Sequence, residues 1–332
     1  LDLAMTGRTS SAGDSGIVRV YTNAAGSFTE SFDASRGLLV SSLEFADYDA
    51  DGDIDLFVAG SEWGVEYTYL YANSGGTFTD STVVFAQPGQ SEKASATWTD
   101  IDNDGLPDVS VLVAYDGLGT EPRTHVYRNC HPLRFSETSL GLRELRYGYA
   151  RWGDVDGDGD LDVALCGRTT VSSNDGYVEV YLNVGATHPN TAPTAPTGLS
   201  SSTSGTEVSF AWGSASDEET PADGLTYNLR VGTASGANDV VAGMSLASGF
   251  RLVPRLGNMG HVKSWTLKGV TPGVTLYWSV QTVDTGLTGS PWAAEHTVWG
   301  DTTPPTVTAT SPVDGATVTV ADVDVDVTFS ET

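Results

Sequence analysis

The sequence has few cysteines and no long apolar run. Cys130 and Cys166 are its only cysteines, and because no Cys-x-x-Cys pair occurs, a cysteine zinc site is not expected. The two cysteines are compatible with one disulfide and at least equally with two buried free thiols. No stretch of 18 or more apolar residues occurs, so no transmembrane helix and no membrane insertion are expected.

Basic residues are also scarce. Lys and Arg number 16 against 43 Asp and Glu, which gives a formal net charge of −27. A surface this acidic repels polyanions, and this argues against nucleic acid or an anionic membrane as a partner. The Gly-, Ser- and Thr-rich, Lys-poor composition is typical of an extracellular protein. The first residues show no signal peptide and both ends fall inside sequence patterns, so we interpret the chain as part of a longer protein.

Familiar catalytic motifs are missing as well. The sequence has no Gly-x-Ser-x-Gly, no His-Glu-x-x-His and no phosphate-binding loop. His125 and His131 flank Cys130, a pattern that suggests zinc or a Cys–His pair, but structural or surface histidines are the favoured interpretation. The acidic run Asp217 to Glu219 is interpreted as a solvated loop. We therefore expect no enzyme in this chain.

The sequence instead contains one acidic nonapeptide in three copies. The copies are DYDADGDID (47–55), DIDNDGLPD (100–108) and DVDGDGDLD (154–162), and all fit Asp-x-Asp-x-Asp-Gly-x-x-Asp. Carboxylates at this density repel one another strongly unless a cation lies among them. A solvated acidic turn explains a single copy, whereas three copies in register favour a cation site.

The spacing of the acidic residues indicates which cation. Hard oxygen ligands at positions 1, 3, 5 and 9, with a backbone carbonyl at position 7, form the kind of set that Ca²⁺ takes. Glycine at position 6 permits the sharp turn that points these oxygens inward. Strand-like runs flank each copy, so the loop closes a β-hairpin instead of joining two helices as in an EF-hand. Because calcium explains every dense Asp cluster, paired carboxylates for glycoside hydrolysis are disfavoured.

A longer repeat surrounds the nonapeptides. An Asp followed by a short apolar strand occurs at Asp2, Asp55, Asp108 and Asp162, at spacings of 53, 53 and 54 residues. A fixed period in this range marks a repeat architecture. A second strand repeats in step with the first, and its tyrosines are Tyr21, Tyr71, Tyr127 and Tyr181.

Each repeat contains about four short strands. In the second repeat we expect them near 41–46, 54–60, 66–72 and 77–80, and a four-stranded sheet repeated radially is a propeller blade. Three loops and part of a fourth repeat predict an open arc, with first strands at 41–46 and near 94–99 and 148–153 along one axis. We expect aromatic side chains two residues before each loop to pack between neighbouring blades: Phe45, Trp98 and Trp152.

These repeats resemble FG-GAP/VCBS repeats, the blades of integrin-α-type β-propellers, over residues 1 to about 186. The resemblance implies three Ca²⁺ sites in a secreted protein. It implies side-chain ligands at Asp47, Asp49, Asp51, Asp55, Asp100, Asp102, Asp104, Asp108, Asp154, Asp156, Asp158 and Asp162. It implies carbonyl ligands at Asp53, Leu106 and Asp160. The second loop has Leu106-Pro107 where the others have Asp-Ile and Asp-Leu, so we expect the weakest site there.

Beyond the repeats, the sequence changes character. Residues 187–197 are rich in Pro and Thr and predict a semi-rigid linker. Residues 198–300 resemble a fibronectin type III domain, with Tyr277 after a Pro-Gly turn and Trp212 in the core. Residues 301–332 resemble the first strands of a bacterial Ig-like domain. The predicted fold class is all-β: an open β-propeller of three to four blades, a fibronectin III-like β-sandwich and a truncated Ig-like segment.

The functional prediction is a calcium-binding, non-catalytic interaction or adhesion module of a larger secreted or surface protein. Its partner is an unidentified protein or glycan. Two alternatives remain open: an accessory, glycan-binding region of a secreted enzyme that acts on polysaccharide, and a structural stalk. The sequence on either side of this chain distinguishes the first two possibilities, because an adjoining catalytic domain favours the enzyme.

Overall fold

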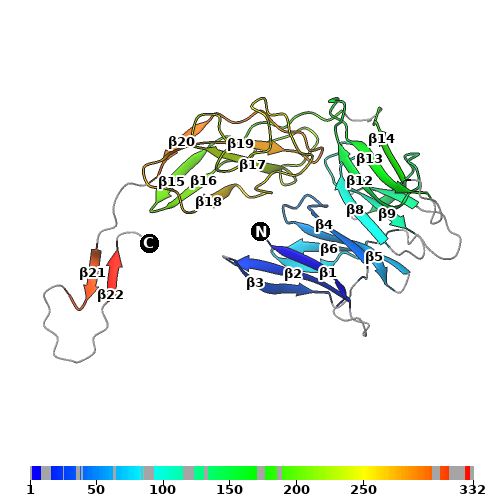
Figure 1. Ribbon diagram of the computed structural model, residues 1–332, viewed down its shortest axis with the longest axis horizontal. Coiled ribbons are helices and arrows are strands. Elements are labelled where there is room, and N and C mark those ends of the chain that lie inside the picture. The colour runs from blue at the N-terminus through cyan, green and yellow to red at the C-terminus, as the bar shows by residue number, and fades with distance from the viewer. Residues whose placement is uncertain are drawn as a thin grey trace. The chain divides into compact units, whose positions relative to one another are not determined.

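The structure is a computed structural model. It describes residues 2–8, 16–24, 26–34, 38, 40–62, 65–83, 85, 93–114, 123–130, 134–169, 176–184, 189–300, 307–313 and 326–329. These residues form strands and connecting segments and contain no helix, so the prediction of an all-β chain is confirmed (Figure 1). No helix in the described part of the chain is long and apolar enough to cross a membrane.

The repeat region forms four antiparallel sheets, each made of strands consecutive in the sequence (Figure 1). The first has three strands: β1 (Leu3–Arg8), β2 (Gly16–Ala24) and β3 (Ser27–Asp33). The second has four: β4 (Val40–Ala46), β5 (Asp55–Glu62), β6 (Val65–Ser74) and β7 (Thr77–Asp80). The third has four: β8 (Lys93–Thr99), β9 (Asp108–Ala114), β10 (Arg123–Asn129) and β11 (Phe135–Thr138). The fourth has three: β12 (Arg146–Gly153), β13 (Asp162–Arg168) and β14 (Gly176–Tyr181).

The first strands of successive sheets lie against each other. β4 contacts β8, and β8 contacts β12, at the predicted positions of the innermost blade strands. The four strands predicted for the second repeat match β4 to β7 within two residues at each end. The sheets therefore stack in a propeller-like series.

The stacking follows from strands that are apolar on both faces. Successive side chains of a strand point to opposite faces of its sheet. In β5, Leu56 and Val58 pack into the core shared with the first sheet, whereas Phe57 and Ala59 pack into the core shared with the third. A continuous apolar run is thus needed to bury both faces.

The aromatic residues that precede the loops lie in these cores, as predicted. Phe45 packs between the first and second sheets, and Trp98 between the second and third. Trp152 is 7% exposed between the third and fourth sheets, where its indole Nε1–H donates to Ser110 Oγ at 3.0 Å. Each aromatic side chain therefore joins a sheet to the preceding one.

The later part of the chain forms two three-stranded sheets packed face to face (Figure 1). One contains β15 (Ser200–Ser204), β16 (Glu207–Ala211) and β18 (Ser264–Leu267). The other contains β17 (Thr226–Gly232), β19 (Thr275–Val283) and β20 (His296–Trp299). Trp212 is buried between them, as predicted. A hairpin of β21 (Val307–Ser311) and β22 (Asp326–Phe329) comes next, and the fibronectin III and Ig-like identities stay predictions.

The contacts divide the chain into two compact units. The first contains residues 1–193 together with two short segments, 216–225 and 284–288, and the second contains the remainder. The predicted domain limits at 1–186, 187–197, 198–300 and 301–332 stay predictions.

Replacing Trp152 with Ala should destabilise the first unit strongly. The change leaves a cavity between two sheets and removes the hydrogen bond to Ser110, so the free energy of unfolding should fall by about 3–5 kcal/mol. Urea denaturation measures this loss. Trp299→Ala is the matched control, because Trp299 is 71% exposed. Equal effects of the two changes would contradict the packing role.

Candidate metal centres

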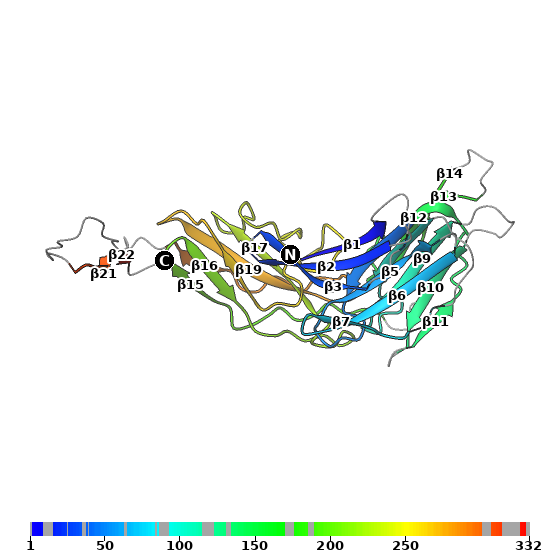
Figure 2. The same cartoon turned by 90° about the horizontal axis from the view of Figure 1, so that it is seen from below.

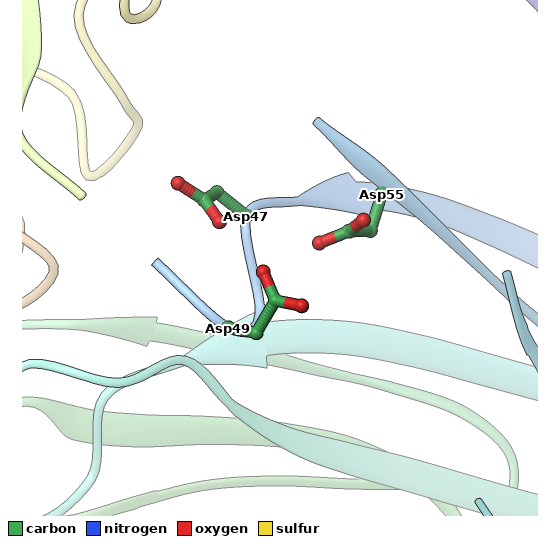
Figure 3. Close-up of side chains that lie close together, drawn as sticks. All are labelled: Asp47, Asp49 and Asp55. Carbon is green, nitrogen blue, oxygen red and sulfur yellow. The ribbon is translucent and has the colours of Figure 1, made fainter. Parts of the chain in front are cut away.

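Three of the predicted ligand positions come together in every loop. Carboxylate oxygens from positions 1, 3 and 9 lie within 4.8 Å of one another. The groups are Asp47, Asp49 and Asp55; Asp100, Asp102 and Asp108; and Asp154, Asp156 and Asp162. In the first group, the loop supplies two side chains and the start of β5 supplies the third, and the carboxylates face a common space (Figure 3). Such a group could hold a metal ion.

The Asp at position 9 holds its loop against the third strand of the sheet. Asp55 is the first residue of β5, and its Oδ2 accepts a hydrogen bond from Tyr48 N at 3.0 Å. Its Oδ1 accepts one from Asn73 N at 2.8 Å. The same two bonds recur at Asp108, from Ile101 N and Asn129 N, and at Asp162, from Val155 N and Asn183 N. Asp2, which precedes β1, accepts the equivalent bond from Asn23 N.

The Asp at position 1 shapes the loop itself. Asp47 accepts hydrogen bonds from the backbone N–H groups of Asp51 and Gly52, at 3.0 and 2.9 Å. Gly52 has a φ of 91°, which lies in the region that favours glycine. Asp100 accepts from Asp104 and Gly105 in the same way. The first carboxylate therefore fixes the turn and also faces the candidate ion.

Positions 5 and 7 do not join the three-residue groups. The side chain of Asp51 accepts a hydrogen bond from Asp53 N at 2.9 Å, and Asp104 and Asp158 accept from Leu106 N and Asp160 N. These bonds give the position-5 carboxylates a role within the turn. Their role as ligands, and that of the carbonyls of Asp53, Leu106 and Asp160, stays a prediction.

Burial and mutual repulsion make the ionised groups unfavourable without a cation. Desolvation is the main cause that raises the pKa of Asp47 and of Asp100 to about 7, and neighbouring carboxylates raise these values further. Desolvation likewise raises the pKa of Asp55 and of Asp108 to about 8. A divalent cation removes this penalty, because an opposite charge at contact distance favours the ionised form.

One buried carboxylate oxygen indicates that the second site fits a cation. Asp102 Oδ1 is buried and has no hydrogen-bond partner among the described residues, while Asp102 Oδ2 pairs with Arg128 Nη1 at 3.1 Å. An unpaired buried carboxylate oxygen is costly unless something binds it. The donor set therefore fits a hard cation, and the nearby guanidinium of Arg128 supports the prediction that this site is the weakest.

Several contacts around the loops come from residues that the nonapeptide pattern does not include. The amide Nδ2 of Asn129, in β10, donates to the carbonyl of Tyr48 in the preceding loop at 2.6 Å. Asn183 donates similarly to the carbonyl of Ile101, at 3.3 Å. Asn103 Nδ2 donates to Asp160 Oδ1 at 2.8 Å and so connects the second and third loops. The recurring Tyr-x-Asn sequence is the signal by which Asn129 and Asn183 could have been found.

The acidic segment 216–225 is solvated only in part: Glu218 and Asp223 are exposed, whereas Asp217 and Glu219 are half-buried. The carbonyl of Glu219 lies so close to Gly105 that a Cβ there would come within 2.1 Å of its oxygen. The segment 284–288 belongs to the same unit, and the hydroxyl of Thr285 donates to Asp100 Oδ2 at 2.7 Å. Both segments thus pack against the second loop, and Thr285 satisfies one of its buried carboxylate oxygens.

The cysteines and histidines do not form a site in the described residues. Cys130 and Cys166 are free thiols, as in the second of the two alternatives, but Cys130 is exposed and Cys166 is half-buried, so the burial expected in that alternative is wrong for both. His125 is buried and its Nδ1 lies 2.6 Å from Glu137 Oε1, which is a structural role. His131 lies outside the described residues.

Comparisons with known proteins agree with the repeat assignment in part of the chain. Residues 47–111 match the FG-GAP-like repeat family, so the predicted resemblance is confirmed for this segment. None of the curated proteins matches the chain. Among solved structures, a fructofuranosidase variant from Schwanniomyces occidentalis, complexed with fructosylnystose, aligns over 88% of this chain and 74% of its own. Its identity is 7% and its TM-score is 0.26, and a likeness of this size supports no conclusion.

Replacing Gly105 with Ala should destabilise the first unit more than replacing Gly157. The two glycines have similar φ angles, 87° and 84°, so backbone strain is comparable. A Cβ at Gly105 meets the Glu219 carbonyl, whereas one at Gly157 has no atom within 4 Å. The difference in unfolding free energy should be about 1–3 kcal/mol in a denaturant titration. Identical losses would mean that segment 216–225 does not pack on this loop.

Without divalent cations, the first unit should lose stability as pH rises. The pKa values of Asp47, Asp55, Asp100 and Asp108 in the folded chain, about 7 to 8, exceed the ordinary value of 3.8, so the folded state holds these protons more tightly than the unfolded state. This contribution is complete below about pH 4 and is lost as pH rises through 7 to 8. Melting temperatures in excess chelator, measured from pH 5 to 9, should therefore fall. A rise over this range would contradict the assignment.

Proposed function

We propose that this chain is a calcium-binding, non-catalytic interaction module of a larger secreted or cell-surface protein. The observation that carries the proposal is the same three-carboxylate group at the same positions of three repeats. Hydrogen bonds to backbone N–H groups hold positions 1 and 9 in each loop, so the geometry is built into the repeat.

Calcium suits these loops better than the other common divalent cations. The groups contain carboxylates alone, without the His or Cys that zinc prefers. Magnesium demands nearly ideal octahedral geometry and retains several waters, whereas calcium accepts six to eight oxygens in flexible arrangements. A loop with further carboxylate and carbonyl oxygens at positions 5 and 7 can supply such a shell. Calcium bound there would neutralise the buried carboxylates.

A role in binding agrees better with the loops than a role in catalysis does. Both oxygens of the position-9 Asp accept hydrogen bonds from backbone N–H groups, so this carboxylate is engaged in holding the hairpin. FG-GAP-like repeats occur in extracellular proteins, and this supports the proposed location. The partner is a protein or a glycan, and a glycan array with the intact chain separates these two classes.

Calcium titration of the intact chain should reveal three binding sites. Asp156→Asn should remove one of them in isothermal titration calorimetry, because a neutral amide is a poorer calcium ligand. The amide oxygen retains the hydrogen bond that Asp156 Oδ1 accepts from Asp158 N, so the melting temperature in chelator should not fall.

Asp80→Asn is the matched control, because Asp80 lies in β7 outside the three groups. It should leave three sites. A wild-type chain that takes up no calcium, or an Asp156→Asn variant with three unchanged sites, would contradict the proposal.

A further inference from the structure

Among the described residues, the fourth sheet has no outer strand of the kind found in the second and third sheets. Those sheets end in β7 and β11, whereas the sheet of β12, β13 and β14 ends in β14 (Figures 1 and 2). In the described part of the chain, no strand pairs with the outer edge of β14. A free edge of this kind presents backbone N–H and C=O groups that can pair with another strand.

The outer strands of the second and third sheets carry an aromatic anchor. Phe135, in β11, is paired with Asn129 of β10. Its ring lies between the second and third sheets, with ring centroids 6.3 Å from Tyr48 and 6.1 Å from Trp98. Phe78, in β7, occupies the same register opposite Asn73 and packs into the preceding core. The outer strand therefore contributes a side chain to the core as well as hydrogen bonds.

A pocket lies where the fourth sheet would hold the corresponding aromatic ring. It has a volume of about 330 Å³ and is lined by Ile101, Trp152, Leu161, Val163 and Tyr181, among others. Ile101 and Trp152 occupy the repeat positions of Tyr48 and Trp98, the two residues that surround Phe135. Its volume is at the lower end of the range for ligand sites, about 300–1,000 Å³. The pocket is therefore the equivalent of the site that holds Phe135 in the third sheet, and no outer strand among the described residues fills it.

We propose that the edge of β14 and this pocket together bind an extended segment of a partner protein. The segment pairs antiparallel to β14 and places a Phe side chain in the pocket. This Phe lies opposite Asn183, just as Phe78 of β7 lies opposite Asn73 and Phe135 of β11 lies opposite Asn129. Main-chain hydrogen bonds supply the pairing, and the pocket selects the side chain.

The charged side chains near β14 restrict which residue the partner segment can have two positions after its Phe. In β11, Glu137 comes two residues after Phe135 and bonds to His125 Nδ1 at 2.6 Å. The repeat places Glu179 where His125 stands, and Arg143 Nε already donates to both oxygens of Glu179 at 2.8 Å. An acidic residue in the bound segment would face the carboxylate of Glu179, and the guanidinium of Arg143 already pairs with that carboxylate. The partner segment therefore has a basic or neutral residue at this position.

The test uses the intact chain in calcium-containing buffer and a labelled peptide. The peptide has the sequence of residues 133–140 with the exchange Glu137→Lys, and fluorescence anisotropy measures binding. We expect saturable binding and a shift of the Trp152 indole signal in nitrogen-15 NMR spectra. A further Phe135→Ala exchange in the peptide should weaken binding at least about tenfold, since burial of a Phe side chain is lost. The peptide that retains Glu137 should also bind more weakly.

A matched pair of variants locates the binding site. Leu182 lines the pocket and is 48% exposed, so Leu182→Glu should weaken binding without unfolding the chain. Trp299, in β20, is 71% exposed and lies outside both β14 and the pocket, so Trp299→Glu should leave binding unchanged. No saturation at millimolar peptide, or equal binding of the peptide with Phe135→Ala, would overturn the proposal. An unchanged affinity of Leu182→Glu would do the same.

Two other occupants are outcomes of the same experiment. Residues 329–332 repeat the Phe-Ser-Glu-Thr sequence of β11. If the peptide binds only to a Phe329→Ala variant, the site belongs to this chain's own segment, and the proposal of a separate partner is wrong. A dimer in sedimentation that the peptide dissociates would instead assign the site to a second copy.

Discussion

The Asp that closes each loop joins three parts of a sheet through one carboxylate. Its backbone begins the second strand, one oxygen accepts from the start of the loop, and the other accepts from the end of the third strand. Because this group is buried in all three repeats, its charge requires compensation. The hydrogen bonds supply part of it, and a cation at the same carboxylates would supply the rest. The fold of each repeat and its candidate metal centre thus depend on the same side chain.

Much of this arrangement is readable from the sequence because the determinants are local and repeated. The interval between Asp2, Asp55, Asp108 and Asp162 defines the repeat, and the apolar run after each of them predicts a strand buried on both faces. The aromatic residues before each loop mark the cores between sheets. The strands of the second repeat could be placed within two residues because turn-forming Asp, Gly and Ser separate them.

The surroundings of the second loop could not be predicted in this way. Thr285 lies 185 residues from Asp100 in the sequence, and no local pattern identifies a hydroxyl that will donate to a buried carboxylate. Segment 216–225 resembles a solvated acidic loop because its composition is polar, yet its backbone packs on Gly105. The position-5 carboxylates illustrate a different limit. Spacing alone does not reveal that the position-5 side chain also closes the turn, as the hydrogen bond from Asp53 N to Asp51 does.

The asparagine bridges give the series of sheets a direction. Asn129 reaches back from the third sheet to the first loop, and Asn183 reaches back from the fourth sheet to the second loop. The first and second loops are thereby held by the sheet that comes after them, as in other arrays whose units interact with their nearest neighbours. The third loop has no later sheet of the series among the described residues, and Asp156 within it is exposed. The first two loops are therefore supported from the sheet that follows them, whereas the third loop is supported from the preceding side, by the hydrogen bond from Asn103 to Asp160.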